Sequence, residues 1–190
     1  MLKRSGMLLL AALTAALVGC AHSPQQLTVQ PQINKPLNPV AQQQPVTVQV
    51  QGKILGTRGG IYPDSSNITI SDSTLPAVRQ QVENALRQLG FNVVPQGTPN
   101  ANSLTLNLSD LSYQSPKSSV YVTQADISAT FVAQARNMNK NYQGRYSSSL
   151  QQRFGYAPNQ ATNTKMVTDV MSDALTRVFQ DPAIIQILQQ

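Results

Sequence analysis

One stretch of this sequence alternates so regularly between apolar and polar residues that it restricts the fold to a β-rich one. Within residues 120–136, Asp126, Ser128, Thr130 and Gln134 separate five apolar positions. These are Ile127, Ala129, Phe131, Ala133 and Ala135. Successive side chains of a strand point to opposite faces, so this pattern predicts a long strand with one buried face.

The alternation resumes after a short break, which predicts a hairpin. The break, Asn137-Met138-Asn139-Lys140, is typical of a turn because asparagine tolerates positive φ. The alternating positions beyond it are Tyr142, Gly144, Tyr146, Ser148 and Leu150. We therefore predict a long antiparallel hairpin over residues 120–153.

Shorter strands are expected upstream. Residues 45–50 alternate with valines on one side, and Leu104, Leu106 and Leu108 do the same in a strand expected near the centre of the sheet. Residues 67–71 and 91–94 are two further short strands by the same criteria.

Two stretches have apolar residues at helical spacing. Asp72 to Pro76 resembles a helix entrance, and Gly90 ends the first stretch as a C′ residue would. The second begins near Asn163 and ends at Asp181-Pro182. A final short turn is expected over residues 183–188. The apolar stripes are Leu75, Val78, Val82, Ala85, Leu86 and Leu89, then Met166, Val167, Val170, Met171, Ala174, Leu175, Val178 and Phe179.

The order of elements predicts the fold class. We expect an α+β domain over residues 46–190, with two helices on one face of a mostly antiparallel or mixed sheet, and the long hairpin directly before the last helix.

The first 19 residues have the parts of a secretory signal peptide. Lys3 and Arg4 are followed by an apolar core over residues 7–18, which is too short to span a membrane. Gly19-Cys20 resembles the lipobox of bacterial lipoproteins, which implies lipid attachment at Cys20. Ala21 stands where that resemblance would place an aspartate for inner-membrane retention, so the inner leaflet of the outer membrane is the expected location.

Residues 20–45 are expected to form a lipidated tether. Five prolines lie among Gln and Asn residues, a composition that favours an extended chain holding the domain about 25–30 Å from the membrane. Residues 27–29 could instead pair as an edge strand, which would shorten that reach.

Charge and cysteine content exclude several classes. Without Lys3 and Arg4 the net charge falls from +6 to about +4, with no run of like charges, so nucleic acid is not an expected partner. The single cysteine leaves no internal disulfide.

The sequence offers little catalytic chemistry. The only histidine, His22, lies in the expected tether, and acidic residues such as Asp169 and Asp173 lack metal-ligating partners. The glycine-rich segment 52–63 lacks the G-K-[ST] ending of a phosphate loop and is expected to be a surface loop. We expect no catalytic residue, metal or cofactor. An alternative is a hydrolase that pairs Asp110 with Asp126 on neighbouring strands.

The hairpin carries the candidate binding surface. Three arginines and two tyrosines there are suited to glycan or protein contact, although exposed cross-strand pairs have the same composition. They are Arg136, Tyr142, Arg145, Tyr146 and Arg153.

Several of these features together resemble the YajG family of bacterial lipoproteins. They are the lipobox, the valine-rich first strand, the helix from Leu75 to Gly90, Thr123-x-Ala125-Asp126-Ile127, the turn at 137–140, Asn141-Tyr142 with Tyr146, and the closing helix. The resemblance implies an outer-membrane-associated lipoprotein without an established activity, and it carries over no functional residue except Cys20.

The expected function is therefore a non-enzymatic, accessory lipoprotein that contacts the membrane through lipid on Cys20 and binds another envelope component. The alternative is a binding module for cell-wall glycan or lipopolysaccharide, acting through the hairpin. Its partner, an envelope protein or a wall polymer, is not identified by the sequence.

Overall fold

The computed structural model describes residues 24–52, 57–58, 67–115 and 123–190. The expected signal peptide, Cys20, His22, most of the glycine-rich segment and residues 120–122 of the expected hairpin lie outside these residues.

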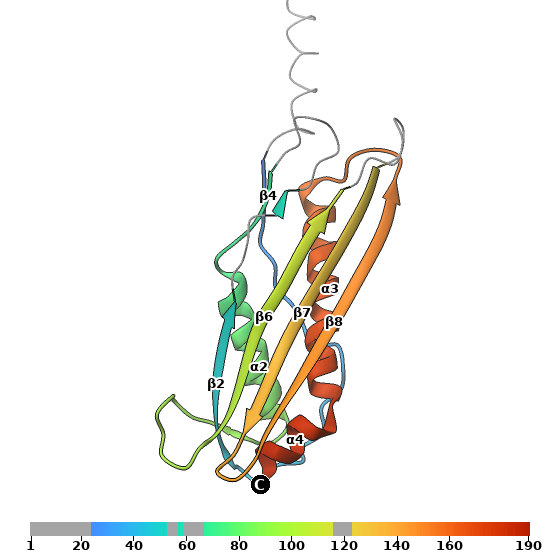
Figure 1. Cartoon of the computed structure of the whole chain (residues 1–190). Helices are drawn as coiled ribbons and strands as arrows, with labels where there is room; N and C mark the ends of the chain where they lie inside the picture. The colour runs from blue at the N-terminus through green and yellow to red at the C-terminus, as the bar shows by residue number, and fades with distance from the viewer. Residues whose placement is uncertain (1–23, 53–56, 59–66, 116–122) are drawn as a thin grey trace, which may run out of the picture.

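The main sheet has five strands in the order β5-β2-β6-β7-β8 (Figure 1). Strand β2 (Pro45–Gly52) runs parallel to both β5 (Asn92–Val93) and β6 (Asn102–Gln114). Strands β6, β7 (Thr123–Arg136) and β8 (Asn141–Phe154) are antiparallel to one another. The sheet is therefore mixed, which is one of the two sheet types that the sequence analysis predicted.

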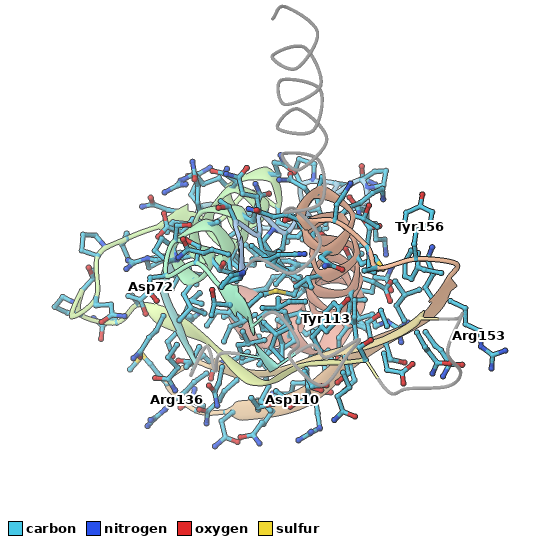
Figure 2. All side chains as sticks on the ribbon, turned by 90° about the horizontal axis from the view of Figure 1, so that it is seen from above. Asp72, Asp110, Tyr113, Arg136, Arg153 and Tyr156 are labelled. Carbon is cyan, nitrogen blue, oxygen red and sulfur yellow. The ribbon has the colours of Figure 1, made fainter. Side chains whose placement is uncertain are left out.

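Helices cover one face of this sheet. Helix α2 (Thr74–Gln88) packs on β2, and α3 (Gln160–Gln180) packs on β7 and β8. The last segment is a third, short helix, α4 (Pro182–Gln189), with Pro182 in its first turn. No described element covers the other face, which Figure 2 shows at the bottom of the molecule, where Asp110 and Arg136 project from it. We call it the open face. The predicted α+β architecture is confirmed.

The core lies between the sheet and the helices. The predicted apolar positions of β7 and β6 are all buried, with Phe131, Leu104 and Leu106 fully inaccessible to solvent. They meet the buried stripes of α2 and α3, including Val82, Leu86 and Leu175. The alternating apolar residues of the strands and the helically spaced apolar residues of the helices thus pack into a single continuous core.

The predicted hairpin is present with an unbroken register from Arg136↔Asn141 to Thr123↔Phe154. Its turn is held by the Asn137 side chain, whose Oδ1 accepts the backbone N–H groups of Asn139 at 2.9 Å and Lys140 at 2.7 Å. Asparagine therefore directs this turn by its side chain, since the residues with positive φ lie elsewhere.

The expected tether is corrected for residues 24–45, which pack on the domain. Strand β1 (Gln25–Leu27) pairs in parallel with β4 (Asn67–Ile70), and β3 (Thr57–Arg58) completes a separate small sheet. Leu27 and Val29 are fully buried. The edge-strand alternative for residues 27–29 was therefore close to the observed structure, with the strand two residues earlier.

Side chains of α3 fix the segment that follows. The backbone N–H of Gln32 donates to Ser172 Oγ at 2.9 Å, and that of Asn34 donates to Thr176 Oγ1 at 3.0 Å. Further along, the N–H groups of Val40 and Ala41 both donate to the Leu89 carbonyl at 2.9 Å. A proline-rich chain cannot join a ladder throughout, so side chains supply its partners.

Candidate functional site

The structure separates the five predicted surface residues onto two faces of the hairpin. Tyr142 and Tyr146 are half-buried and point to the helices, whereas Arg145 and Arg153, an odd number of residues away, point to the open face. Arg136 lies opposite Asn141 in the register, so its side chain is on the same open face as those of Arg145 and Arg153. Strand periodicity causes this separation, and no single patch contains all five residues.

The two tyrosines converge on one carboxylate at the junction of α3 and α4. The hydroxyls of Tyr142 and Tyr146 donate to Oδ2 of Asp181 at 2.8 and 2.5 Å. Oδ1 of the same carboxylate accepts the N–H of Ala183 at 2.9 Å and so caps α4. Asp181 thus joins β8 to both C-terminal helices.

Gly144 makes room for this arrangement. A Cβ atom at this position would lie 2.1 Å from the Tyr146 hydroxyl oxygen. Any larger residue would therefore displace Tyr146 from Asp181.

The electrostatics of this cluster are those of a structural site. Burial and the hydrogen bond to Asp181 raise the pKa of Tyr146 well above its usual range, and the hydrogen bond to Asp181 raises the pKa of Tyr142. Burial would raise the pKa of Asp181, but hydrogen bonds from Tyr146, Tyr142 and the Ala183 N–H outweigh it and lower that pKa. Tyrosines that stay protonated and a carboxylate that stays charged do not exchange protons near neutral pH.

The open face is lined by hydroxyls and amides that bond to one another. Ser112 and Ser128 hydroxyls lie 2.8 Å apart, and Ser128 also donates to Asp110 at 3.1 Å. A shallow hollow of about 300 Å³ lies among them. Its lining residues are Ser112, Gln114, Asp126, Ile127, Ser128, Ser149, Leu150 and Gln151.

Asp110 and Asp126 do not form a pair. Asp110 lies opposite Thr130 in the register, four residues along β7 from Asp126. At about 3.4 Å per residue this separates their backbone positions by about 14 Å along the strand, and the Asp110 carboxylate accepts the Ser128 hydroxyl. Asp126 instead accepts the Gln124 amide with both oxygens, at 2.9 and 3.0 Å.

Among the described residues no cluster of His, Cys, Asp and Glu could hold a metal ion. Asp169 forms an ion pair with Lys165, and Asp173 forms one with Arg177, each one turn away on α3. Nor is any helix in the described ranges long and apolar enough to span a membrane.

Two buried asparagines close the end of the domain near α4. Sequence reasoning placed Asn137 in the turn but did not predict its contact with α4, and it did not single out Asn102. Asn102 Nδ2 donates to the Leu188 carbonyl at 2.8 Å, and Asn137 Nδ2 donates to the Ile187 carbonyl at 3.0 Å. They satisfy two of the last four carbonyls of α4, which a helix leaves without internal partners. Their positions at strand ends were visible in the sequence, but their partners were not.

Comparisons with known proteins give a family. The model of a family described as "Uncharacterized lipoprotein" matches residues 31–189. No curated protein matches the sequence.

Solved structures with a similar chain path are distant. A Xanthomonas campestris protein of the DUF330 family is 12% identical, with a TM-score of 0.48 over 88% of this chain and 95% of the other. The rare lipoprotein B of Shewanella oneidensis is 13% identical, with a TM-score of 0.43 over 74% of this chain and 96% of the other.

Proposed function

This chain belongs to that lipoprotein family, and on this premise we propose that it is a non-enzymatic lipoprotein of the outer membrane. It is anchored in the inner leaflet through lipid on Cys20. It binds another envelope component through the open face of its sheet. The observation that carries the proposed binding role is that face itself, a polar surface of β6, β7 and β8 that no described element covers.

Membership of the family and the N-terminal sequence support the anchor. Cys20 ends an apolar segment after Gly19, and a lipoprotein family is the context in which such a cysteine carries lipid. Ala21 supports the outer membrane as the destination, by the resemblance to bacterial lipoproteins.

The composition of the open face supports a polar partner. Val132 is the only apolar residue among the outward positions of β7 and β8, and the others carry hydroxyl, amide or charged groups. Arg136, Arg145 and Arg153 add donors in a fixed fork geometry that suits carboxylate or phosphate acceptors. These groups recognise a hydrated, acidic protein surface better than an apolar one.

Binding of wall glycan or lipopolysaccharide is the second candidate, and the three arginines on the open face are the observation that favours it. The two tyrosines of the predicted binding surface lie on the opposite face and donate hydrogen bonds to Asp181. Recognition of a glycan would then depend on hydrogen bonds and on arginine contacts to anionic groups, without aromatic stacking.

A photo-crosslinking experiment in intact envelopes tests the leading proposal. A photoreactive amino acid at Gln134, exposed on the open face, is compared with one at Gln80, exposed on the outer side of α2. We expect a discrete crosslinked product from position 134 and none of that size from position 80. Equal products from both positions would contradict recognition by the open face.

A matched charge change separates specific contact from general attraction. Replacing Arg136, Arg145 and Arg153 by Gln removes three charges from the open face, and replacing Arg79, Arg87 and Arg177 by Gln removes three from the helices. The helix arginines form exposed i,i+4 ion pairs, whose loss costs at most about 0.5 kcal/mol each. Only the first triple variant is expected to lose the crosslink from position 134.

Sedimentation of purified wall polymer with the protein distinguishes the second candidate. Co-sedimentation that weakens with salt and with the open-face triple variant, in the absence of a protein crosslink, would favour the polymer over a protein partner. Separately, Cys20→Ser is expected to release the protein from the outer-membrane fraction. Retention of that variant in the membrane would contradict the anchor.

A further inference from the structure

The two edges of the main sheet are unlike. Strand β5 at one edge has 2 residues, whereas β8 at the other has 14 and is the outermost strand in Figure 1. No described strand pairs with the outer side of β8. Its register with β7 contains no bulge and its sequence contains no proline. Natural proteins usually shorten, bulge or cover such an edge because its free backbone groups pair with other strands.

The hairpin register determines which backbone groups are free. The Asn137 N–H donates to the Lys140 carbonyl, so the next pair, Arg136↔Asn141, is a non-hydrogen-bonded one, and the two kinds alternate along β8. The odd-numbered residues therefore direct both N–H and C=O away from β7. They are Asn141, Gln143, Arg145, Ser147, Ser149, Gln151 and Arg153.

These seven residues are arranged symmetrically about Ser147. We propose that two copies of this chain pair through β8 in antiparallel fashion, with the two-fold axis at Ser147, so that their sheets join into one. In this register Gln143 lies opposite Gln151 of the second copy, and Ser147 lies opposite itself. Every outward N–H and C=O group of the seven then has a partner, and the two open faces become one continuous face.

Complete pairing of the seven residues and the positions of the arginines together select this register. With the axis at Ser147, Arg145 lies opposite Ser149 and Arg153 lies opposite Asn141, so no like charges meet. Moving the axis by one residue, to Tyr146 or Ser148, leaves Arg153 or Asn141 of each copy without a partner within β8. Moving it by two residues in one direction places Arg145 opposite itself, and moving it by two in the other direction places Arg145 opposite Arg153. The first two registers lose backbone pairing at the ends of β8, and like charges directly opposite destabilise the other two, so all four are disfavoured.

The helix side of the edge would also be covered. Tyr146 and Leu150 are half-buried members of the core margin, and they lie within the strand that pairs. Joining a second copy removes more of their apolar surface from water. The inference needs neither lipid on Cys20 nor a partner for the open face, so it stands or fails separately from the proposed function.

Disulfide trapping tests the register. In the full chain with Cys20→Ser, Ser147→Cys would supply the only thiol. Cα atoms in a hydrogen-bonded antiparallel pair are about 5.5 Å apart, within the range that a disulfide spans. Gln143→Cys is the matched control, because its position is equally exposed on β8 but about 27 Å from its counterpart across the axis.

We expect Ser147→Cys to form a covalent dimer under mild oxidation at least tenfold faster than Gln143→Cys. Equal rates, no dimer from either variant, or faster dimer formation by Gln143→Cys would each overturn the proposed pairing. The double variant Gln143→Cys, Gln151→Cys provides a second test, since these residues face each other across the axis but lie too far apart within one chain to bond.

A charge test uses the same symmetry without cysteines. Ser149→Arg places an arginine opposite Arg145 of the second copy, whereas Gln143→Arg adds the same charge to the same edge opposite Gln151. Sedimentation equilibrium of the Cys20→Ser chain should show a dimer whose dissociation constant rises about tenfold or more in Ser149→Arg and changes little in Gln143→Arg. An equal rise in both variants, or a monomer at every concentration before substitution, would overturn the proposal.

Discussion

The hydroxyl of Tyr113 donates to Oδ1 of Asn163 across 2.8 Å, and both side chains are buried. This hydrogen bond joins β6 to the first turn of α3. Asn163 also donates through Nδ2 to Gln25 Oε1 at 2.8 Å and to the Pro158 carbonyl at 3.3 Å. One asparagine therefore connects β1, β6 and the loop before α3, three segments distant in sequence.

Tyr113→Phe removes the donor and leaves Asn163 Oδ1 buried without this partner. An unsatisfied buried acceptor costs about 1–3 kcal/mol, so we expect the free energy of unfolding to fall by that amount. Urea denaturation of the variant and the unsubstituted protein measures the difference. An unchanged midpoint and slope would show that the hydrogen bond contributes nothing to stability.

The same tyrosine predicts a loss of stability in alkali. Burial raises the pKa of Tyr113 from 10.0 to about 12. Its protonated form is thus favoured in the folded state, and the resulting stability is complete below pH 10 and is lost as the pH rises to about 12. Over that interval the unsubstituted protein should lose stability relative to Tyr113→Phe. Parallel stability curves for the two proteins would be inconsistent with this prediction.

Asp181 has two separable roles, and two substitutions distinguish them. Asp181→Ala removes the cap of α4 and the acceptor of both tyrosine hydroxyls, for an expected loss of about 2 kcal/mol. Asp181→Asn keeps a side-chain oxygen for the Ala183 N–H, so its loss should be less than half as large. Thermal or urea unfolding of both variants provides the comparison, and equal losses would mean that the cap is unimportant.

Acid should remove the contribution of the Asp181 charge. The pKa of this carboxyl is lowered from 3.8, so the stability it contributes is present above that value and declines as the pH falls through the lower folded-state pKa. The difference in stability between the unsubstituted protein and Asp181→Asn should therefore shrink in this acidic interval. A difference that stays constant down to complete protonation would contradict the lowered pKa.

Gly144→Ala should destabilise the domain, whereas Gly155→Ala should not. The new Cβ at position 144 meets the Tyr146 ring and hydroxyl at 2.1 to 2.8 Å, and overpacking of this kind typically costs about 1–3 kcal/mol. At position 155 a Cβ would meet no atom within 4 Å. Equal thermal stabilities of the two variants would show that Tyr146 moves aside without cost.

The sequence predicted the hairpin and the helices well because their signals are local. Alternation from Ile127 to Ala135 and the asparagine turn require no knowledge of distant residues, and each buried face follows from the period. The parallel pairing of β2 with β6 could not be predicted in the same way, because β3, β4, α2 and β5 lie between the two strands in the sequence. The period of apolar residues predicts which face of a strand is buried, but it does not predict which strand pairs with it.

The N-terminal segment was misjudged because composition was the only guide. Prolines and amides indicate an extended chain, and residues 24–45 are indeed mostly without regular structure. Composition cannot show that Ser172 and Thr176 on α3 offer hydroxyls to that chain. The alternating Leu27 and Val29 were the one local signal of burial, and both are fully buried.

The separation of the tyrosines from the arginines could have been predicted. Tyr142 and Tyr146 have even numbers and Arg145 and Arg153 have odd numbers, so a regular strand must place them on opposite faces. Their common acceptor could not, since Asp181 reaches them only through the packing of α3 and α4 on β8. For the candidate site, the sequence could therefore predict the sheet face on which each residue lies, but not the residue with which it forms a hydrogen bond.

The start of β1 at Gln25 limits how far the domain can travel from a lipid-bearing Cys20. Four residues separate the two positions, and even a fully extended chain covers only about 3.3–3.6 Å per residue. With lipid on Cys20, as proposed, Gln25 would stay within about 18 Å of the bilayer surface, a distance shorter than β8 itself. Under the proposed anchor, the small sheet that contains β1 would therefore face the layer next to the membrane, and the reach of the far end would be set by the length of the domain and not by a tether.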